Sequence, residues 1–157
     1  MPAKTPDTLR QAVYRAEDQW SALMDRGGHI DFFGSTITAP VQLRFGNVND
    51  VRDYVDRVCR ARGIPAIQVR HRRGGTRAHY EVRADGGVIA VPTDQPWAMR
   101  ESVVLHEIAH HVAITVHASA HHDREFTSSM LALVQEFLGH EAELLLRTSY
   151  QAAGVPT

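Results

Sequence analysis

The amino-acid sequence predicts an α+β fold in a single domain that covers residues 1–157. Three observations support this prediction: the length suits one hydrophobic core, helical patterns lie toward both ends, and short strand-like segments lie between them. Apolar residues make up 43% of the chain and charged residues 22%, which is typical of a globular protein. Helices and strands occur in separate runs rather than in regular alternation, which favours α+β over α/β.

The first third of the chain predicts two helices with a short strand region between them. Thr5-Pro6-Asp7 is typical of a helix start, and apolar residues follow at helical spacing until Gly27. Residues 37–45 alternate loosely and predict one strand or two short ones. We expect Asn49 to cap a second helix that Gly63 ends.

Three further strands are predicted in the middle of the chain. They cover residues 66–70, 79–83 and 88–91, with turns at 72–76 and 85–87. Because each strand follows the previous one after a short turn, we expect a small antiparallel meander.

The second half of the sequence is mainly helical. A long helix is predicted from about Pro96 to about Val116, followed by a loop rich in alanine, serine and histidine. A last helical stretch runs from about His122 to Tyr150, and Gly139 is expected to break it. We therefore expect the meander to pack against the long helix and its flanking helices.

Composition excludes several classes of protein. The formal net charge of −1 and the pI of about 6.8 give no global attraction to nucleic acid or anionic membranes. Cys59 is the only cysteine, so an intramolecular disulfide and a CxxC zinc site are both impossible. The first seven residues lack the apolar segment of a secretion signal, and the most apolar stretch contains histidines and a glutamate. We expect a cytoplasmic protein without a membrane anchor.

The long helix carries the motif HExxH at His106–His110. Six of the ten histidines lie between His106 and His122, which first suggests a metal site. Residues four apart project from one helix face about one turn apart, so the imidazoles of His106 and His110 can share one ion. Glu107 lies beside them and is suited to act as a general base toward an activated water molecule.

The motif is rarely produced by chance, but it has an alternative interpretation. This composition gives roughly 0.03 chance occurrences in a chain of this length. The alternative is a histidine-rich core helix that binds no metal. Two buried histidines and a buried glutamate without partners would be costly, which favours the metal site.

A catalytic zinc ion usually takes three protein ligands and a water molecule, so a third ligand is required. The downstream candidates are His111, His117, His121, His122 and Asp123. His111 points about 100° away from His110 around the helix, so it is a poor candidate. His121 and His122 follow a turn, where the chain can fold back onto the metal.

The segment His122–Phe126 resembles the HGxEF element that follows HExxH in the SprT/Spartan-like zinc metalloproteases. The resemblance covers roughly residues 92–137 and implies a zincin-like fold and a zinc cofactor. It implies three zinc ligands and a general base, which are His106, His110 and His122 with Glu107.

Asp123 stands where that family usually has glycine, which keeps His121 open as an alternative third ligand. Most of the chain also resembles a group of small actinobacterial metallohydrolases. The segments that carry this second resemblance are residues 13–17 and 106–111. It supplies no substrate.

Two further segments are candidates for contacts with a substrate or partner. The strand of Val88, Ile89, Ala90 and Val91 could be an edge strand that pairs with an extended peptide, or an ordinary core strand. The turn around residues 70–77 could contact phosphate or nucleic acid, or could be a solvated turn. Its candidate residues are Arg70, Arg72, Arg73 and Arg77.

These patterns favour a zinc-dependent hydrolase, and the family resemblance favours a peptidase acting on a peptide or protein. Two alternatives remain open at this point. One is a metal-bound nucleic-acid-associated or regulatory module without turnover. The other is a zinc hydrolase of a non-peptide amide or ester, since the same activated water serves all of these substrates.

Overall fold

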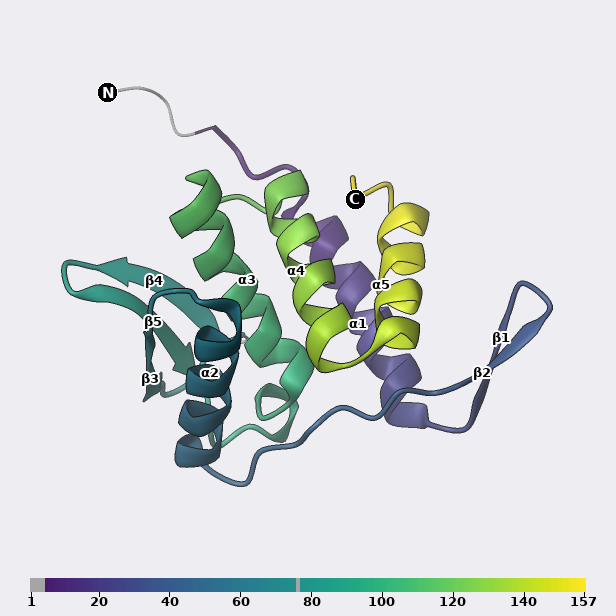
Figure 1. Cartoon of the computed structure of the whole chain (residues 1–157), viewed down its shortest axis with the longest axis horizontal. Coiled ribbons are helices and arrows are strands. Elements are labelled where there is room, and N and C mark those ends of the chain that lie inside the picture. The colour runs from purple at the N-terminus through teal and green to yellow at the C-terminus, as the bar shows by residue number, and fades with distance from the viewer. Residues whose placement is uncertain (1–4, 76) are drawn as a thin grey trace.

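The computed structural model describes residues 5–75 and 77–157, and it has the α+β architecture that the sequence predicts (Figure 1). Residues 1–4, and Thr76 of the predicted turn at 72–76, lie outside the described residues. The elements of the described part are α1 (Arg10–Arg26), β1 (His29–Phe32), β2 (Ser35–Thr38), α2 (Val48–Arg62), β3 (Ile67–His71), β4 (His79–Arg83), β5 (Gly86–Val91), a 3₁₀ helix (Pro96–Ala98), α3 (Glu101–His117), α4 (Arg124–Phe137) and α5 (His140–Ala152).

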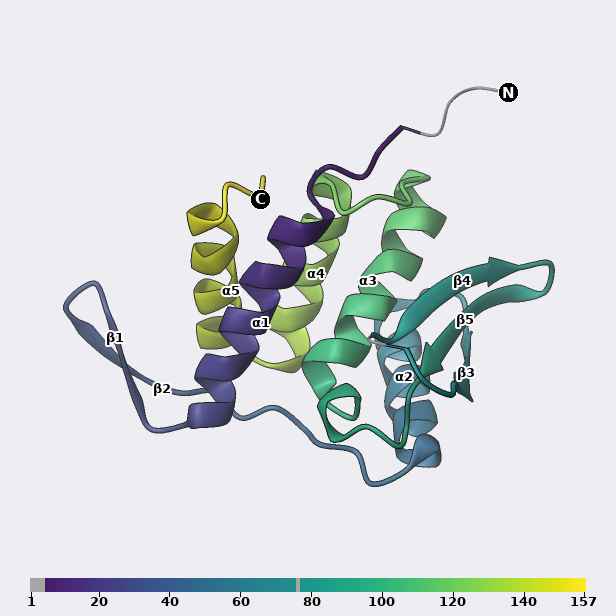
Figure 2. The ribbon, with the colours of Figure 1, turned by 180° about the vertical axis from the view of Figure 1, so that it is seen from behind.

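Helix α3 lies between two groups of elements. The sheet of β3, β4 and β5 lies on one side of it with α2, and α1, α4 and α5 lie on the other (Figures 1 and 2). Its apolar residues Leu105, Ile108 and Ala109 are fully buried. On the far side, the Trp20 indole of α1 donates a 3.0 Å hydrogen bond to the Ala142 carbonyl of α5. The predicted metal helix is therefore the central element of the core.

The three-stranded sheet is not the antiparallel meander that the sequence predicts. Its order is β3-β5-β4, with β5 parallel to β3 and antiparallel to β4. The reason is burial: Val88–Val91 are at most 1% exposed, so the most apolar strand takes the central place and the more polar strands take the edges.

Of the two interpretations of Val88–Val91, the strand order supports the core strand and not the edge strand. Both sides of β5 are already paired, so its backbone cannot accept a substrate strand. Among the described residues, β4 pairs with β5 alone and is an edge strand instead.

Several helix ends differ from the predictions. Helix α1 begins at Arg10 without a side-chain cap, later than the start that was predicted at Thr5-Pro6-Asp7. Asp7 contacts His122 instead of lying in the first turn of the helix. The cap of α2 is Asn47 rather than Asn49, and its side-chain oxygen accepts from two backbone N–H groups. Gly63 ends α2 at a φ of 61°, as predicted.

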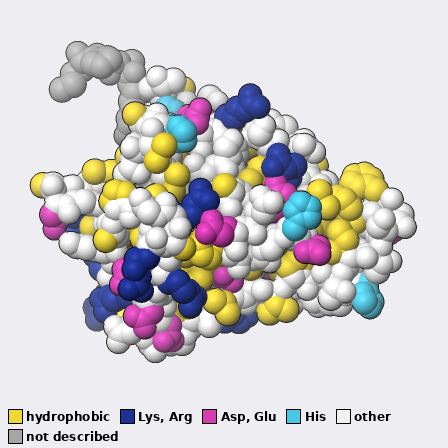
Figure 3. All heavy atoms as spheres, in the orientation of Figure 1, with side chains coloured by type: hydrophobic (Ala, Val, Ile, Leu, Met, Phe, Trp, Pro, Cys, Tyr) yellow, Lys and Arg dark blue, Asp and Glu magenta, His cyan; other side chains and the backbone are white. Residues whose placement is uncertain are grey.

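The region between α1 and α2 forms a hairpin that extends from the body of the molecule (Figures 1 and 2). Its strands cover residues 29–32 and 35–38, so only residues 37–38 of the predicted 37–45 strand region lie in this hairpin. Farther along that region, Arg44 forms a single antiparallel bridge with Arg100. Phe33 at the turn is 87% exposed. On the face in Figure 3, apolar side chains gather over this hairpin, and basic side chains gather over α2 with acidic ones beside them.

The C-terminal helices follow the sequence pattern closely. The predicted long helix is split into the 3₁₀ turn at Pro96–Ala98 and α3, and the predicted break at Gly139 separates α4 from α5. Gly139 has a φ of 102°, which favours glycine. None of the helices in residues 5–75 and 77–157 combines the length and apolar character that crossing a bilayer requires.

Candidate metal centre

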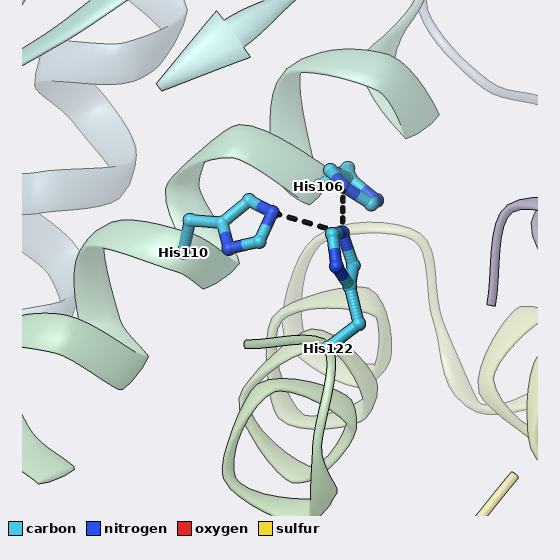
Figure 4. A group of neighbouring side chains, drawn as sticks. All are labelled: His106, His110 and His122. Atoms are coloured by element: carbon cyan, nitrogen blue, oxygen red, sulfur yellow. Dashed lines mark hydrogen bonds between the residues drawn. The ribbon is translucent and has the colours of Figure 1, made fainter. Parts of the chain in front are cut away.

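Three histidine side chains converge where α3 meets the start of α4 (Figure 4). His106 and His110 come from successive turns of α3, and His122 comes from the loop before α4. Their nearest ring nitrogens lie within 4.8 Å of one another. The Nε2 atom of His122 lies 3.1 Å from Nε2 of His110 and 3.3 Å from Nε2 of His106. The three side chains therefore lie close enough to bind one metal ion.

The loop that carries His122 is shaped by the two helix ends beside it. Ala118 ends α3 in the left-handed region at a φ of 55°. Asp123 caps α4, because its side chain accepts hydrogen bonds from the backbone of Glu125 and Phe126. The chain turns back between these points and directs His122 toward α3, and His121 does not join the cluster. Asp123 therefore fits this loop as the cap of α4.

Two carboxylates hold the outer nitrogens of the cluster. Asp7 Oδ2 lies 2.7 Å from His122 Nδ1, and Glu17 Oε2 lies 2.5 Å from His106 Nδ1. The other oxygen of Glu17 accepts a 2.5 Å hydrogen bond from the Tyr150 hydroxyl of α5. Carboxylates in this position commonly fix the tautomer and orientation of metal-binding histidines.

Asp7 and Glu17 are not among the site residues predicted from the sequence. Glu17 lies on the apolar stripe of α1 beside Val13, Ala16 and Trp20, all fully buried, and this charged residue on a buried face was the available signal. Asp7 carried no comparable signal, because its pattern matched a helix start.

The protonation of the cluster suits a cation. Burial lowers the pKa of His110 to about 2 and that of His106 well below its usual value, with the neighbouring histidines adding to both shifts, so these rings are neutral. The pKa of Asp7 is lowered through its contact with His122, despite its burial. Asp7 is therefore an acceptor, and His122 Nδ1 donates to it. This contact turns Nε2 of His122 toward Nε2 of His110.

Facing lone pairs at 3.1 Å repel each other unless a cation or a proton lies between them. Three neutral imidazoles with converging nitrogens are the donor set that zinc takes in catalytic sites. The residues present therefore fit a metal ion of this kind.

Glu107 is 4% exposed and lies between two hollows on the surface. Burial, with a further contribution from the negative charge of Glu17, raises its pKa to about 8. The larger hollow is a solvent-open groove with about 1930 Å³ of space, bounded in part by β4, and it also reaches His110 and His122. The smaller hollow, of about 460 Å³, reaches His106, Ser102 and Trp97.

Tyr14 covers the cluster from α1. Its ring stacks on His106 with the centroids 5.0 Å apart and an interplanar angle of 17°, and it lies 5.1 Å from the ring of His122. Burial, followed by the charge of Glu107, raises the pKa of Tyr14 to about 12, so its hydroxyl keeps its proton. Tyr14 lines both hollows.

His111 points away from the cluster and connects α3 to the sheet. Its Nε2 donates to the Pro65 carbonyl at 2.9 Å, so its Nδ1 accepts from the Tyr80 hydroxyl at 2.8 Å. Gly87 leaves room for this contact, because a Cβ there would lie 2.7 Å from both His111 Nδ1 and the Tyr80 hydroxyl oxygen. His111 therefore has a structural role.

Asp123 and Glu125 follow His122 in the sequence, but they do not lie behind the rings of the three histidines. Asp123 is used as the cap of α4 and also accepts from the Ser119 hydroxyl. Glu125 lies 3.4 Å from His117 on the surface, away from the cluster. Asp7 and Glu17 occupy these positions instead.

The four arginines of the 70–77 region divide between two environments. Arg72 and Arg77 line the groove beside the histidines. Arg70 forms an ion pair with Glu81 at 3.3 Å, and Arg73 is exposed to solvent. They do not share one surface.

Comparison of the chain with protein-family models, curated proteins and solved structures found no significant match.

Proposed function

We propose that this protein is a zinc-dependent hydrolase that cleaves peptide bonds, with a zincin-like arrangement similar to that of the SprT/Spartan-like proteases. The observation that carries the proposal is the convergence of His106, His110 and His122 beside Glu107 at the base of an open groove. A buried cluster without function would not need a solvent-open groove leading to it.

Zinc is the proposed ion because all three donors are imidazole nitrogens and the only cysteine, Cys59, is buried elsewhere in the core. A zinc ion held by these residues would polarise the scissile carbonyl and lower the pKa of a water molecule. Asp7 and Glu17 hold the rings of His122 and His106 in the orientation that directs Nε2 inward.

Glu107 is the proposed general base and acid. It lines the groove beside the histidines, where the positive charge of a bound ion would favour its carboxylate form despite the raised pKa. That carboxylate can take a proton from the attacking water. The same carboxyl can then give this proton to the leaving nitrogen. Its neighbour Tyr14 keeps a phenolic hydrogen-bond donor at the same groove.

The substrate in this proposal is an extended peptide that pairs with β4. Ala78, His79 and Tyr80 line the groove, and β4 is an edge strand among the described residues. Backbone hydrogen bonds to an edge strand accept many sequences. The groove is open to solvent along this strand, whereas a pocket for a small molecule usually encloses most of its ligand. This open form favours a peptide over a small amide or ester.

The test is a comparison of wild-type protein with Glu107→Gln. Zinc content by mass spectrometry should be equal in the two proteins, and cleavage of denatured casein should be lost in the variant. Wild-type protein that contains zinc but cleaves no casein and no peptide library would refute peptidase activity. Hydrolysis of aryl esters alone would then support the non-peptide alternative.

A further inference from the structure

The groove beside the histidines has a concentration of arginines that the near-neutral chain as a whole does not have. Its lining includes Arg10 and Arg15 of α1 with Arg72 and Arg77 of the loop between β3 and β4. The acidic residues of the same lining are Asp7, Asp18 and Glu107. Asp7 and Glu107 belong to the metal centre, so Asp18 is the one acid opposite the four arginines in this lining.

The guanidinium groups of two of these arginines lie near the ring of Tyr14, which covers the metal centre. The guanidinium of Arg77 lies 3.8 Å from the centroid of the Tyr14 ring, and that of Arg10 lies 5.8 Å from it. Tyr14 in turn stacks on His106. Arg77, Tyr14 and His106 therefore form a stack that leads from the groove to the metal centre.

The guanidinium groups retain hydrogen-bonding capacity. Among the described residues, Arg77 donates to Asp18 at 3.3 Å, and Arg72 donates to the Arg77 carbonyl at 3.3 Å. A guanidinium has five N–H donors in a planar fork that matches a carboxylate. Arg72 and Arg77 are also partly shielded from solvent, which strengthens an ionic contact relative to the open surface.

We propose that the groove binds a substrate carboxylate close to the scissile bond, through Arg77 with Arg10 and Arg72. This inference rests on the proposed function, since it names the class of peptide that the hydrolase prefers. The carboxylate comes either from an acidic side chain or from the C-terminus of a peptide, because both present the same two oxygens to a guanidinium.

A carboxylate fits the groove better than a nucleic-acid backbone. A phosphate backbone requires a series of basic contacts along its path. Here Arg70 is paired with Glu81, and Asp18 lies within the basic group itself. The arrangement suits one anionic group rather than a continuous run of phosphates.

The test uses four matched fluorescent peptides that differ in the presence and the position of a carboxylate. One has a glutamate beside the scissile position and an amidated C-terminus, and a second has glutamine at that position with the same amide. The third and fourth carry glutamine with a free C-terminus at a short or a long distance from the scissile position. Cleavage by the zinc-loaded enzyme gives kcat/KM for each peptide.

We expect kcat/KM to be at least about 10-fold higher for the peptide with the correctly placed carboxylate than for the neutral one, as for a charge-assisted hydrogen bond. The preference should nearly disappear in Arg77→Gln and fall further in Arg10→Gln/Arg77→Gln. The control Arg73→Gln, on an exposed arginine of the same loop, should keep the preference. Equal kcat/KM for all four peptides would overturn the inference.

Binding measurements separate this inference from the proposed function. Anisotropy of the same peptides on zinc-loaded Glu107→Gln, and on metal-free wild-type protein, requires no turnover. Tighter binding of the acidic peptide that weakens with added salt supports the carboxylate site even if no peptide is cleaved. Tighter binding of a DNA oligonucleotide that depends on Arg70 and Arg73 would overturn it.

Discussion

Replacement of Glu17 by glutamine should weaken zinc binding while leaving all three histidines in place. Glu17 makes two hydrogen bonds at once: it accepts one from the Tyr150 hydroxyl and shares the other with His106 Nδ1. Glutamine keeps the shape but has one oxygen and one NH₂ group. One of the two contacts must therefore reorganise inside a site that is closed to solvent.

The size of the expected loss in zinc affinity follows from the buried position of Glu17. Loss of a carboxylate behind a metal-binding histidine typically costs about 10–100-fold in metal affinity. Glu17 is only 8% exposed, so water cannot replace the lost contact and the expected effect is toward the upper end, near 100-fold. This corresponds to about 2.7 kcal/mol of zinc-binding free energy. Asp7→Asn should have a smaller effect, because the Asp7 side chain is 23% exposed.

The assay is competition for zinc between the protein and a chromophoric chelator. Glu125→Gln is the matched control, because this glutamate lies near His117 on the surface and should not affect the affinity. Urea denaturation of the metal-free proteins separates a loss of zinc affinity from a loss of folding. Glu17→Gln protein that folds and binds zinc with the wild-type affinity would refute the role assigned to Glu17.

Three further predictions concern the fold around the site. Tyr54→Phe should lower the free energy of unfolding, measured with urea, by about 2 kcal/mol, because the Tyr54 hydroxyl donates a buried 2.6 Å hydrogen bond to Glu101. An unchanged free energy of unfolding would contradict the importance of this bond. Gly87→Ala should lower the free energy of unfolding by about 1–3 kcal/mol, because the added Cβ clashes with His111. The thermal midpoint of unfolding measures this loss, and a wild-type midpoint would show that the sheet can shift without cost. Burial raises the pKa of the Cys59 thiol from 9.0 to about 11. The folded protein therefore stays mostly thiol at pH 9.0 and should react with iodoacetamide far more slowly than protein unfolded in urea; equal rates would contradict the buried position.

The local sequence pattern was enough to predict most of the helices and the order of helices and strands along the chain. The glycines at positions 27, 63 and 139 mark helix ends where the sequence analysis expected them, because a left-handed or unusual φ is a local requirement. The strand order could not be predicted in the same way. It depends on which strand gains most from burial on both sides, and only the packing of α2 and α3 on the sheet decides this.

The sequence by itself determined the pair His106 and His110 and the adjacent Glu107, because the spacing of side chains on a helix is independent of the rest of the fold. It narrowed the third member of the cluster to residues after the next turn. The tertiary structure selected His122, added Asp7 and Glu17 behind the rings, and brought Tyr14 and Arg77 to the groove. These residues come from distant parts of the chain, so their proximity depends on long-range packing that no local pattern encodes.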